Sequence, residues 1–330
     1  MTTPPINILL TGGLGVNGAW VTRKLVERGY RPVVLENRID VSLIGDDIAR
    51  RIELVEADVT DLDALLGIFR EHTIRRVVHM AALITGIQAE PLTGFEVNAT
   101  GTVKVLEAAS RTGVERVVFT SSRGAYGHID GPCAHPHYQP ITEDHAQRPY
   151  LVYDVCKVAA EGMGRNYARM RGLQFVALRF AQIYGPGKLQ RHGPYGIFSR
   201  LIESPLAGKP VTIPRGGDQR DDVIYVDDIA EAIVVALLKD RLAYDAYNIS
   251  RGVGTTLHDF ADAVRAAVPG AQIEIGPGLD YHGLGASYCG IMDNTRARTD
   301  LGFEPKFDLK RGVAHYVATM KQLGLQPVTG

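Results

Sequence analysis

The sequence has little of what disulfide-rich, metal-binding, membrane-spanning or nucleic-acid-binding proteins need. Its 330 residues include three cysteines, at positions 133, 156 and 289, which are too few and too scattered for a disulfide framework or a paired-cysteine zinc site. No apolar run approaches the roughly 18 residues that suggest a membrane span. The formal net charge of -1 provides no basic field for nucleic acid or an anionic membrane. Because the N-terminus also lacks the basic region of a signal peptide, the sequence predicts a cytoplasmic protein.

Short apolar runs alternate with amphipathic stretches over the first part of the chain. We expect strands at 6–11, 31–36, 52–58, 75–82, 115–122 and 174–180, and helices at 17–29, 62–72, 95–113 and 151–171. Continuous apolar strands that alternate with helices are typical of a parallel sheet covered on both faces. Right-handed crossovers then make the sheet doubly wound. We therefore predict an α/β protein built on a Rossmann domain.

The pattern loosens after Gly185, where a loop rich in glycine and proline covers 184–196. We expect a dinucleotide-binding domain over 1–182 and about 223–250, and a smaller, discontinuous substrate-binding lobe over 183–222 and 251–330. A cleft between the two, at the carboxyl ends of the strands, would hold the substrate.

The segment "TGGLGVNG" directly follows the first strand and opens the first helix. Glycines let such a turn approach a pyrophosphate closely, and the helix N-terminus offers free N–H groups to the anion. The alternative is a tight strand-to-helix turn without a ligand. The residues expected to bind the cofactor here are Gly12, Gly15, Val16, Asn17 and Gly18.

An acidic residue, Glu36, ends the second strand at the distance from the glycines that dinucleotide-binding folds use. Its carboxylate would accept hydrogen bonds from the adenosine ribose and repel a 2′-phosphate, which favours NAD over NADP. The nearby Arg38 could soften that preference, and a solvated strand end is the alternative. Asp58 and Val59, in the segment that ends the third strand, are expected beside the adenine.

These motifs occur together with "HMAA", "VNATGTVKVLEAA", "TSSRGAYG", "YDVCK", "RFAQIYGPG", "RDDVIYVDDIAEAI" and "LGFEPKF". In this order and spacing, over nearly the whole chain, they resemble the extended short-chain dehydrogenases/reductases, the NAD-dependent epimerase/dehydratase family. The resemblance implies that Tyr153 is the general acid/base, Lys157 its partner, and Ser122 a hydrogen-bond donor to the reacting oxygen.

The same resemblance implies further roles for the first domain. Ala81 and Ala82 would line the cofactor, Asn98 would support the site, and Phe180 would lie near the nicotinamide. The helices at 95–113 and 151–171 would form the four-helix interface of a homodimer.

Elementary chemistry supports the Tyr153–Lys157 pair. Residues four apart on a helix share a face, so the lysine ammonium is expected near the phenol. A nearby positive charge favours phenolate and lowers the tyrosine pKa from about 10. Tyr153 would then take a proton from a substrate hydroxyl while NAD takes the hydride from the same carbon. The alternative is an ordinary polar helix face.

Four positions depart from the pattern of the family's nucleotide-sugar enzymes. Arg123 and Gly124 stand where dehydratases often carry an Asp-Glu pair, which disfavours water elimination. Gln182 replaces a common asparagine, and Asp222 replaces an aromatic residue after Arg220, the arginine expected to grip a diphosphate. A carboxylate at 222 would disfavour a nearby anion.

The loop after residue 184 carries Lys188, Arg191 and His192, which could bind an anionic substrate or only face solvent. The residues expected to contact the substrate are Ser122, Arg123, Gln182, Lys188, Arg191 and Arg220. A second loop, 127–140, holds three histidines and Cys133. Its spacing is not a zinc signature, so we expect no metal and leave open a lid, a substrate contact or a plain surface loop.

The sequence thus predicts an NAD-dependent oxidoreductase or epimerase acting by hydride transfer at a secondary alcohol or ketone of a sugar-type substrate, free or nucleotide-linked. One alternative is a dehydrogenase or reductase of a small polyol, sugar acid or hydroxy-ketone with net NADH production. A non-catalytic dinucleotide sensor is the alternative from another class. The expected partner is a small molecule, with no nucleic acid and no membrane.

Overall fold

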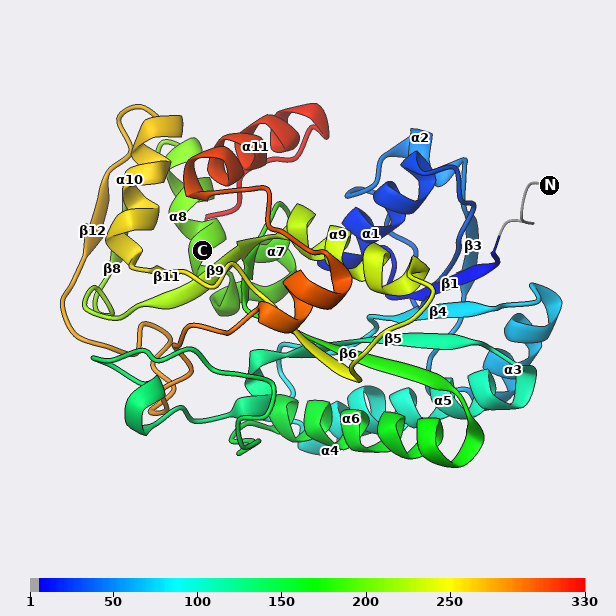
Figure 1. Ribbon diagram of the computed structural model, residues 1–330. Helices are drawn as coiled ribbons and strands as arrows, with labels where there is room; N and C mark the ends of the chain where they lie inside the picture. The colour runs from blue at the N-terminus through cyan, green and yellow to red at the C-terminus, as the bar shows by residue number, and fades with distance from the viewer. Residues whose placement is uncertain (1–5, 330) are drawn as a thin grey trace.

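Seven parallel strands form the central sheet of the protein, seen in a computed structural model that describes residues 6–329 (Figure 1). The strand order is β10-β6-β5-β4-β1-β2-β3. The strands are β1 (Ile8–Thr11), β2 (Val33–Glu36), β3 (Glu53–Glu56), β4 (Arg76–His79), β5 (Arg116–Ser122), β6 (Gln174–Phe180) and β10 (Ala246–Ile249). The predicted doubly wound sheet is therefore confirmed.

Helices cover both faces of this sheet, as the unbroken apolar strands require. Along β1, Ile8 and Leu10 pack into the core on one face, whereas Leu9 packs into the core on the other. The first face is covered by α1 (Val16–Glu27) and α9 (Val226–Leu238), and the second by α3 (Leu62–Glu71), α5 (Gly101–Thr112) and α6 (Val152–Arg171) (Figure 1). A short α2 (Asp46–Ala49) follows β2. Within residues 6–329 no helix is long and apolar enough to cross a bilayer.

The helix expected at 95–113 is interrupted. It consists of α4 (Pro91–Phe95), a π-helical turn (Glu96–Thr100) and α5. The wider turn contains Asn98, whose side chain hydrogen-bonds both the N–H and the C=O of Leu83, at 2.7 and 2.8 Å. Pi turns of this kind are common at functional sites, and residue periodicity does not reveal them.

The remaining elements form a second lobe with two small sheets. One has the order β11-β9-β7, from Gly254–Thr255, Asp221–Tyr225 and Gln182–Tyr184, and the other pairs β12 (Ile273–Ile275) with β8 (Val211–Ile213). Its helices are α7 (Lys188–His192), α8 (Ile197–Leu206), α10 (Leu257–Ala267) and α11 (Leu309–Gln322). Between β9 and α9 the chain returns from the second lobe to the central sheet, because α9 packs on α1 and β10 pairs with β6. The exact boundaries of the division expected near residues 182 and 223–250 stay a prediction.

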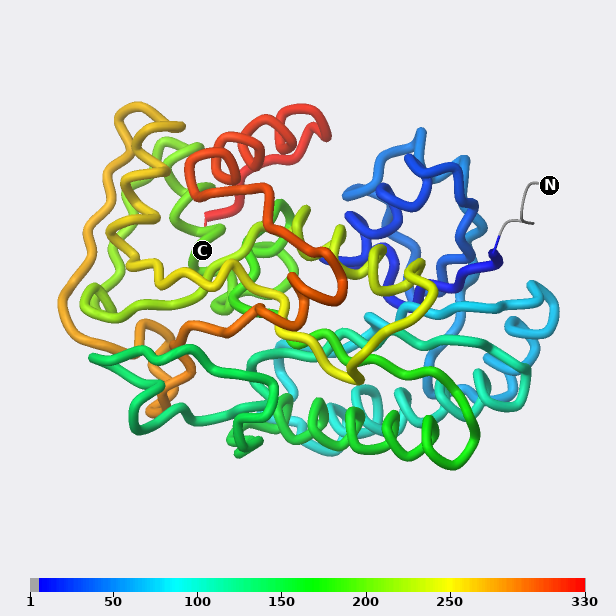
Figure 2. Tube along the Cα trace, viewed as in Figure 1, coloured from blue at the N-terminus to red at the C-terminus, as the bar shows by residue number. Residues whose placement is uncertain are grey.

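Two segments far apart in the sequence, 127–145 and 282–293, run side by side below the small sheets (Figure 2). Ile129 N–H donates to Ser287 O at 2.7 Å, and Ile141 N–H donates to Ile291 O at 2.8 Å. The C-terminal part of the chain is thereby joined to the loop that precedes α6.

Candidate active site

The glycine turn lies at the point where the strand order reverses. The chain leaves β1 for β2 on one side, and β4 lies on the other, so a crevice opens above their carboxyl ends. A side chain on Gly12 would lie 2.6 Å from Ala81 N, and one on Gly18 would collide with Gly12 O. Gly12 also has a φ of 72°. These glycines therefore allow the turn to pack directly against the β4 loop and against α1.

A cavity with an open volume of about 980 Å³ runs along this turn. It is lined by the predicted cofactor residues Gly12, Gly15, Val16, Asn17, Gly18, Glu36, Asp58, Val59, Ala81 and Ala82. Glu36 Oε1 accepts a hydrogen bond from Leu14 N–H at 2.6 Å. Burial raises the pKa of the Glu36 carboxyl, and the Leu14 N–H and the charge of Arg191 oppose that effect.

A second cavity, with an open volume of about 1220 Å³, continues from the first. The two share lining residues Asn17, Met80, Ala82, Ile84, Thr120 and His192. At this junction Asn17 Oδ1 is buried and, among the described residues, has no hydrogen-bond partner. Two joined cavities that are lined by a helix N-terminus, a carboxylate and an unpartnered acceptor fit a dinucleotide.

Ser122, Tyr153 and Lys157 all line the second cavity. Ser122 ends β5, and its Oγ accepts from Gly124 N–H at 3.0 Å, which leaves its own hydroxyl proton free to donate. Lys157 Nζ donates to Thr120 O at 2.7 Å and lies 5.2 Å from the centre of the Tyr153 ring. Burial lowers the pKa of Lys157 to about 8. The structure thus brings together the three residues expected to carry the chemistry.

The expected effect of Lys157 on Tyr153 is not seen in the chain by itself. Burial raises the pKa of the Tyr153 phenol, and the neighbouring Asp154 carboxylate raises it further. The ammonium lies over the ring and is held by the Thr120 carbonyl, so the prediction of a lowered pKa is wrong for the protein without cofactor. Within residues 6–329 nothing hydrogen-bonds the Tyr153 hydroxyl, and Tyr153 lines the second cavity.

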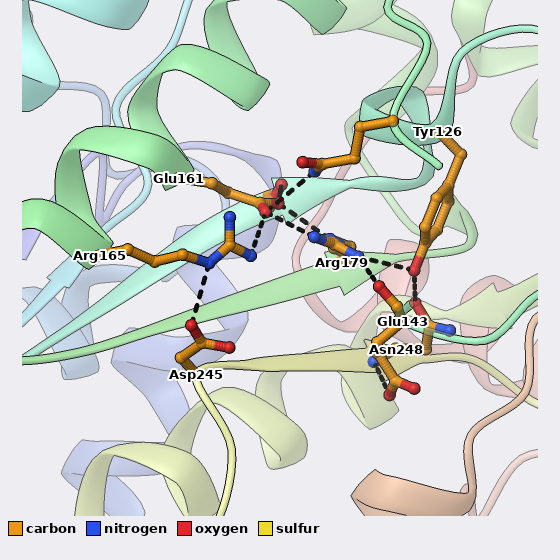
Figure 3. Close-up of polar contacts among 9 residues, drawn as sticks. Tyr126, Glu143, Glu161, Arg165, Arg179, Asp245 and Asn248 are labelled. Carbon is orange, nitrogen blue, oxygen red and sulfur yellow. Dashed lines mark hydrogen bonds and ion pairs between the residues drawn. The ribbon is translucent and has the colours of Figure 1, made fainter. Parts of the chain in front are cut away.

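A buried polar network holds the inner face of α6 (Figure 3). Both oxygens of Glu161, one turn after Lys157, accept from the Arg179 guanidinium of β6, at 3.0 and 2.7 Å. Arg179 also donates to the Tyr126 hydroxyl at 3.0 Å, and Ser121 Oγ donates to Glu161 at 2.5 Å. Because the network joins α6 to β5 and β6, it fixes the rotation that points Tyr153 and Lys157 into the cavity.

Asn98 and Phe180 do not line the first cavity, and their positions are compatible with the supporting role and the nicotinamide contact expected of them. Asn98 is outside the cofactor cavity and acts on it through Leu83, which lines the cavity. Phe180 lines the substrate side.

Besides Ser122, three of the expected substrate residues line the second cavity: Arg123, Gln182 and Lys188. The Arg123 guanidinium forms an ion pair with Asp221 and donates to Gln182 Oε1 at 3.2 Å. His192 lines both cavities, and burial lowers its pKa to about 3.

Arg191, Arg220 and Asp222 do not behave as expected. Arg191 crosses to the cofactor side, where it donates to Leu14 O at 2.5 Å and to Asp40 at 2.8 Å. Arg220 is exposed and is not among the residues that line either cavity. Asp222 points away from the cavity and accepts from the N–H groups of Arg251 and Gly252, both at 3.0 Å. It therefore does not repel a substrate anion.

Sequence reasoning missed the acidic corner of the substrate cavity. Asp154 lines the cavity next to Tyr153, and a side chain on Gly124 would collide with its Oδ1. Its other oxygen accepts from Leu151 N–H at 2.9 Å and from the Tyr288 hydroxyl. Gly124 and Asp154 are both visible in the motifs, but their contact depends on a fold that brings together residues thirty positions apart. Tyr195 and His282 also line the cavity without a sequence signal.

The loop 127–140 has structural roles. His128 Nδ1 accepts from Ser287 N–H at 3.1 Å, and the His135 ring packs edge-on against Tyr138. The loop contributes no side chain to the second cavity. Over residues 6–329 there is no group of three or more histidine, cysteine, aspartate or glutamate side chains arranged to hold a metal.

Known proteins are similar to this chain in both sequence and fold. Residues 8–250 match the NAD dependent epimerase/dehydratase family. The UDP-glucose 4-epimerase of Mycolicibacterium smegmatis is 32% identical over 315 residues, which are 94% of this chain and 96% of that protein. The UDP-glucose 4-epimerase of Thermotoga maritima, solved with UDP-glucose, is 29% identical with a TM-score of 0.83, covering 96% of this chain and 99% of that one. The Thermus thermophilus UDP-glucose 4-epimerase in complex with NAD is 27% identical with a TM-score of 0.80, at the same coverage.

Proposed function

The chain belongs to the NAD dependent epimerase/dehydratase family, and from this premise we propose that it transfers a hydride at a secondary alcohol or ketone of a sugar-type substrate, free or nucleotide-linked. The observation that carries the proposal is the meeting of Ser122, Tyr153 and Lys157 in a cavity continuous with the glycine turn. Turnover of a panel of sugar acids and sugar nucleotides, followed by NADH absorbance and product chromatography, tests it. Failure of every sugar-type compound would count against the substrate class.

In the proposed mechanism Tyr153 is the group that moves the proton. Its hydroxyl is protonated in the chain by itself, because burial raises its pKa. It can therefore donate its proton to a ketone oxygen as the ketone is reduced to an alcohol. In the reverse reaction, the Tyr153 oxygen must accept that proton. A bound dinucleotide would supply the hydride donor for the ketone in its reduced form and the hydride acceptor for the alcohol in its oxidised form, and the positive ring of the oxidised form would favour the phenolate.

The other two catalytic residues orient and polarise. Ser122 Oγ, held by Gly124 N–H, can donate to the reacting oxygen and share its developing charge. Lys157, held by Thr120 O, keeps a positive charge beside the Tyr153 ring when it is protonated. We assign cofactor binding to the residues that line the first cavity, with Phe180 on the nicotinamide side and Asn98 as a support of the Leu83 loop.

Glu36 underlies our proposal that NAD is preferred to NADP. One of its oxygens is held by Leu14 N–H, which points the carboxylate into the cofactor cavity. A 2′-phosphate would meet this negative charge. Titration of the apo-protein with both dinucleotides tests the preference, and tighter binding of NADP would contradict it.

Epimerisation and net oxidation differ in what becomes of the hydride. An epimerase returns it to the other face of the same carbon, so turnover gives no net NADH and the cofactor stays bound. Arg191 favours this outcome, because it reaches from α7 to Leu14 O in the glycine turn and to Asp40. Stoichiometric NADH production from added NAD would instead show a dehydrogenase.

We also propose a homodimer in which α4, α5 and α6 form the interface. Large apolar side chains on α4 and α6 are exposed: Leu92 (80%), Phe95 (43%), Val155 (42%), Met163 (37%) and Met170 (66%). Sedimentation analysis tests the assembly, and a Met170→Glu variant that stayed dimeric would contradict the interface. The expected location remains the cytoplasm.

A further inference from the structure

Besides the proposed catalytic Lys157, the substrate cavity is lined by Arg123 and Lys188, and these two side chains differ in whether the protein compensates their charge. Arg123 is compensated, because its guanidinium pairs with the buried Asp221 and donates to Gln182. Asp221 in turn accepts from the Tyr281 hydroxyl. This group needs no ligand to satisfy its charge.

Lys188 has no such compensation. It opens α7, only 9% of the residue is exposed, and it lines the same cavity as Ser122 and Tyr153. Among residues 6–329 its ammonium has neither a hydrogen-bond acceptor nor a carboxylate partner. Burial, with the charge of Arg123, lowers the pKa of Lys188 to about 7. The side chain is nine-tenths buried, and removing an ammonium from water without giving it a protein partner is costly, so the retention of Lys188 needs a reason.

The groups around Lys188 do not provide a counter-charge. His192 and His282 both lie within its electrostatic reach, and burial lowers the pKa of each to about 3, so both rings are neutral near pH 7. The pyrophosphate of a dinucleotide does not provide one either. The glycine turn that fits it lines the first cavity, and Lys188 is not among the lining residues there.

We propose that Lys188 binds an oxyanion of the substrate, which makes the substrate an acidic sugar-type molecule. This inference rests on the proposed function, because it places the anion in the cavity where Tyr153 meets the reacting carbon. A single unpaired ammonium matches one carboxylate, and the exposed Arg220 adds no second charge inside the cavity. A sugar acid is therefore the favoured source, and the phosphoryl groups of a nucleotide-linked sugar are the other source of the same chemistry.

Calorimetry on the NAD-loaded protein tests the role of Lys188. The ligands are D-galacturonate, D-galactose, which has the same ring without the carboxylate, and UDP-glucose. We expect Lys188→Met to weaken galacturonate binding by about 10- to 100-fold, as loss of a charged hydrogen bond implies, and to leave galactose binding unchanged. The matched control is Lys310→Met, at an exposed lysine on α11, which should change neither.

The outcomes separate the two sources and the two proposals. A loss confined to UDP-glucose assigns the oxyanion to a phosphoryl group. Equal affinity of wild type and Lys188→Met for both anions, or no anion binding by the wild type, overturns the inference. Lys188→Gln, with thermal unfolding of each variant, guards against misfolding. Tyr153→Phe should keep the lysine-dependent binding and lose turnover. If the wild-type protein binds the anions through Lys188 but turns over none of the ligands, the result counts against the proposed function and not against the role of Lys188.

Discussion

The two walls of the cleft treat their charged groups in opposite ways. On the wall formed by the seven-stranded sheet and α6, Lys157, Glu36 and Glu161 are each held by a neighbour in the protein. On the wall supplied by the second lobe, the buried Lys188 has no partner within residues 6–329. The charged groups of the first wall are held in place before any substrate binds, as preorganised catalysis requires. On the second wall, the charge of Lys188 is left for the ligand to compensate, and such an interaction can discriminate between substrates.

The largest expected effect tests the first wall directly. Tyr153→Phe removes the only proposed proton-transfer group and should lower the hydride-transfer rate by about 10³-fold, within the range for a positioned acid or base. Single-turnover kinetics with NAD-loaded protein measure it. Unchanged turnover would remove Tyr153 from the mechanism and would revive a dinucleotide-sensing role.

Glu161→Gln should destabilise the protein by about 3–5 kcal/mol, because it leaves the Arg179 charge buried and uncompensated. Denaturant unfolding measures the free energy. The matched control is Glu304→Gln, whose partner Arg298 lies at 3.3 Å on the surface, and which should cost less than about 1 kcal/mol. Similar losses for the two variants would contradict the contrast between network and surface pair.

Removing the charged group of the second wall should stabilise the protein, whereas removing Glu161 should destabilise it. Lys188→Met removes an uncompensated buried charge, so it should raise the free energy of unfolding by about 1–4 kcal/mol. In the folded protein the pKa of Lys188 is lowered from 10.5 to about 7. Between these pH values the Lys188 amine is therefore protonated in the unfolded chain and mostly neutral in the folded one. The stability gain of the variant should therefore be greatest below pH 7 and fall as pH rises towards 10.5. A gain that does not change with pH would contradict the origin in charge.

A smaller effect is expected where the two walls touch. Arg191→Ala removes hydrogen bonds to Leu14 O and Asp40 and should speed NAD release by about 10-fold. Stopped-flow displacement measures the rate. Arg28→Ala, which breaks a pair with Glu231 outside the cavities, is the control and should leave the rate unchanged. An equal rate for the two variants would show that α7 does not retain the cofactor.

The sequence predicts the first wall well because its determinants are local. The glycine turn, Glu36 and the Tyr153–Lys157 spacing each occupy a single strand end or helix turn, so short motifs carry them. The second wall depends on contacts between distant positions. Whether Arg191 or Lys188 faces the substrate is decided by how α7 meets the glycine turn, and spacing does not contain that information. For the same reason Asp154, which contacts Gly124 and Tyr288, could not be found.

The position of α7 has a kinetic consequence. This five-residue helix contributes Lys188 to the substrate cavity, Arg191 to the glycine turn and His192 to both cavities. A ligand seated on Lys188 would therefore hinder the departure of the dinucleotide. If the enzyme catalyses net oxidation, the alternative to epimerisation, we expect a compulsory order in which the dinucleotide enters first and leaves last, and product-inhibition patterns that indicate random order would refute it.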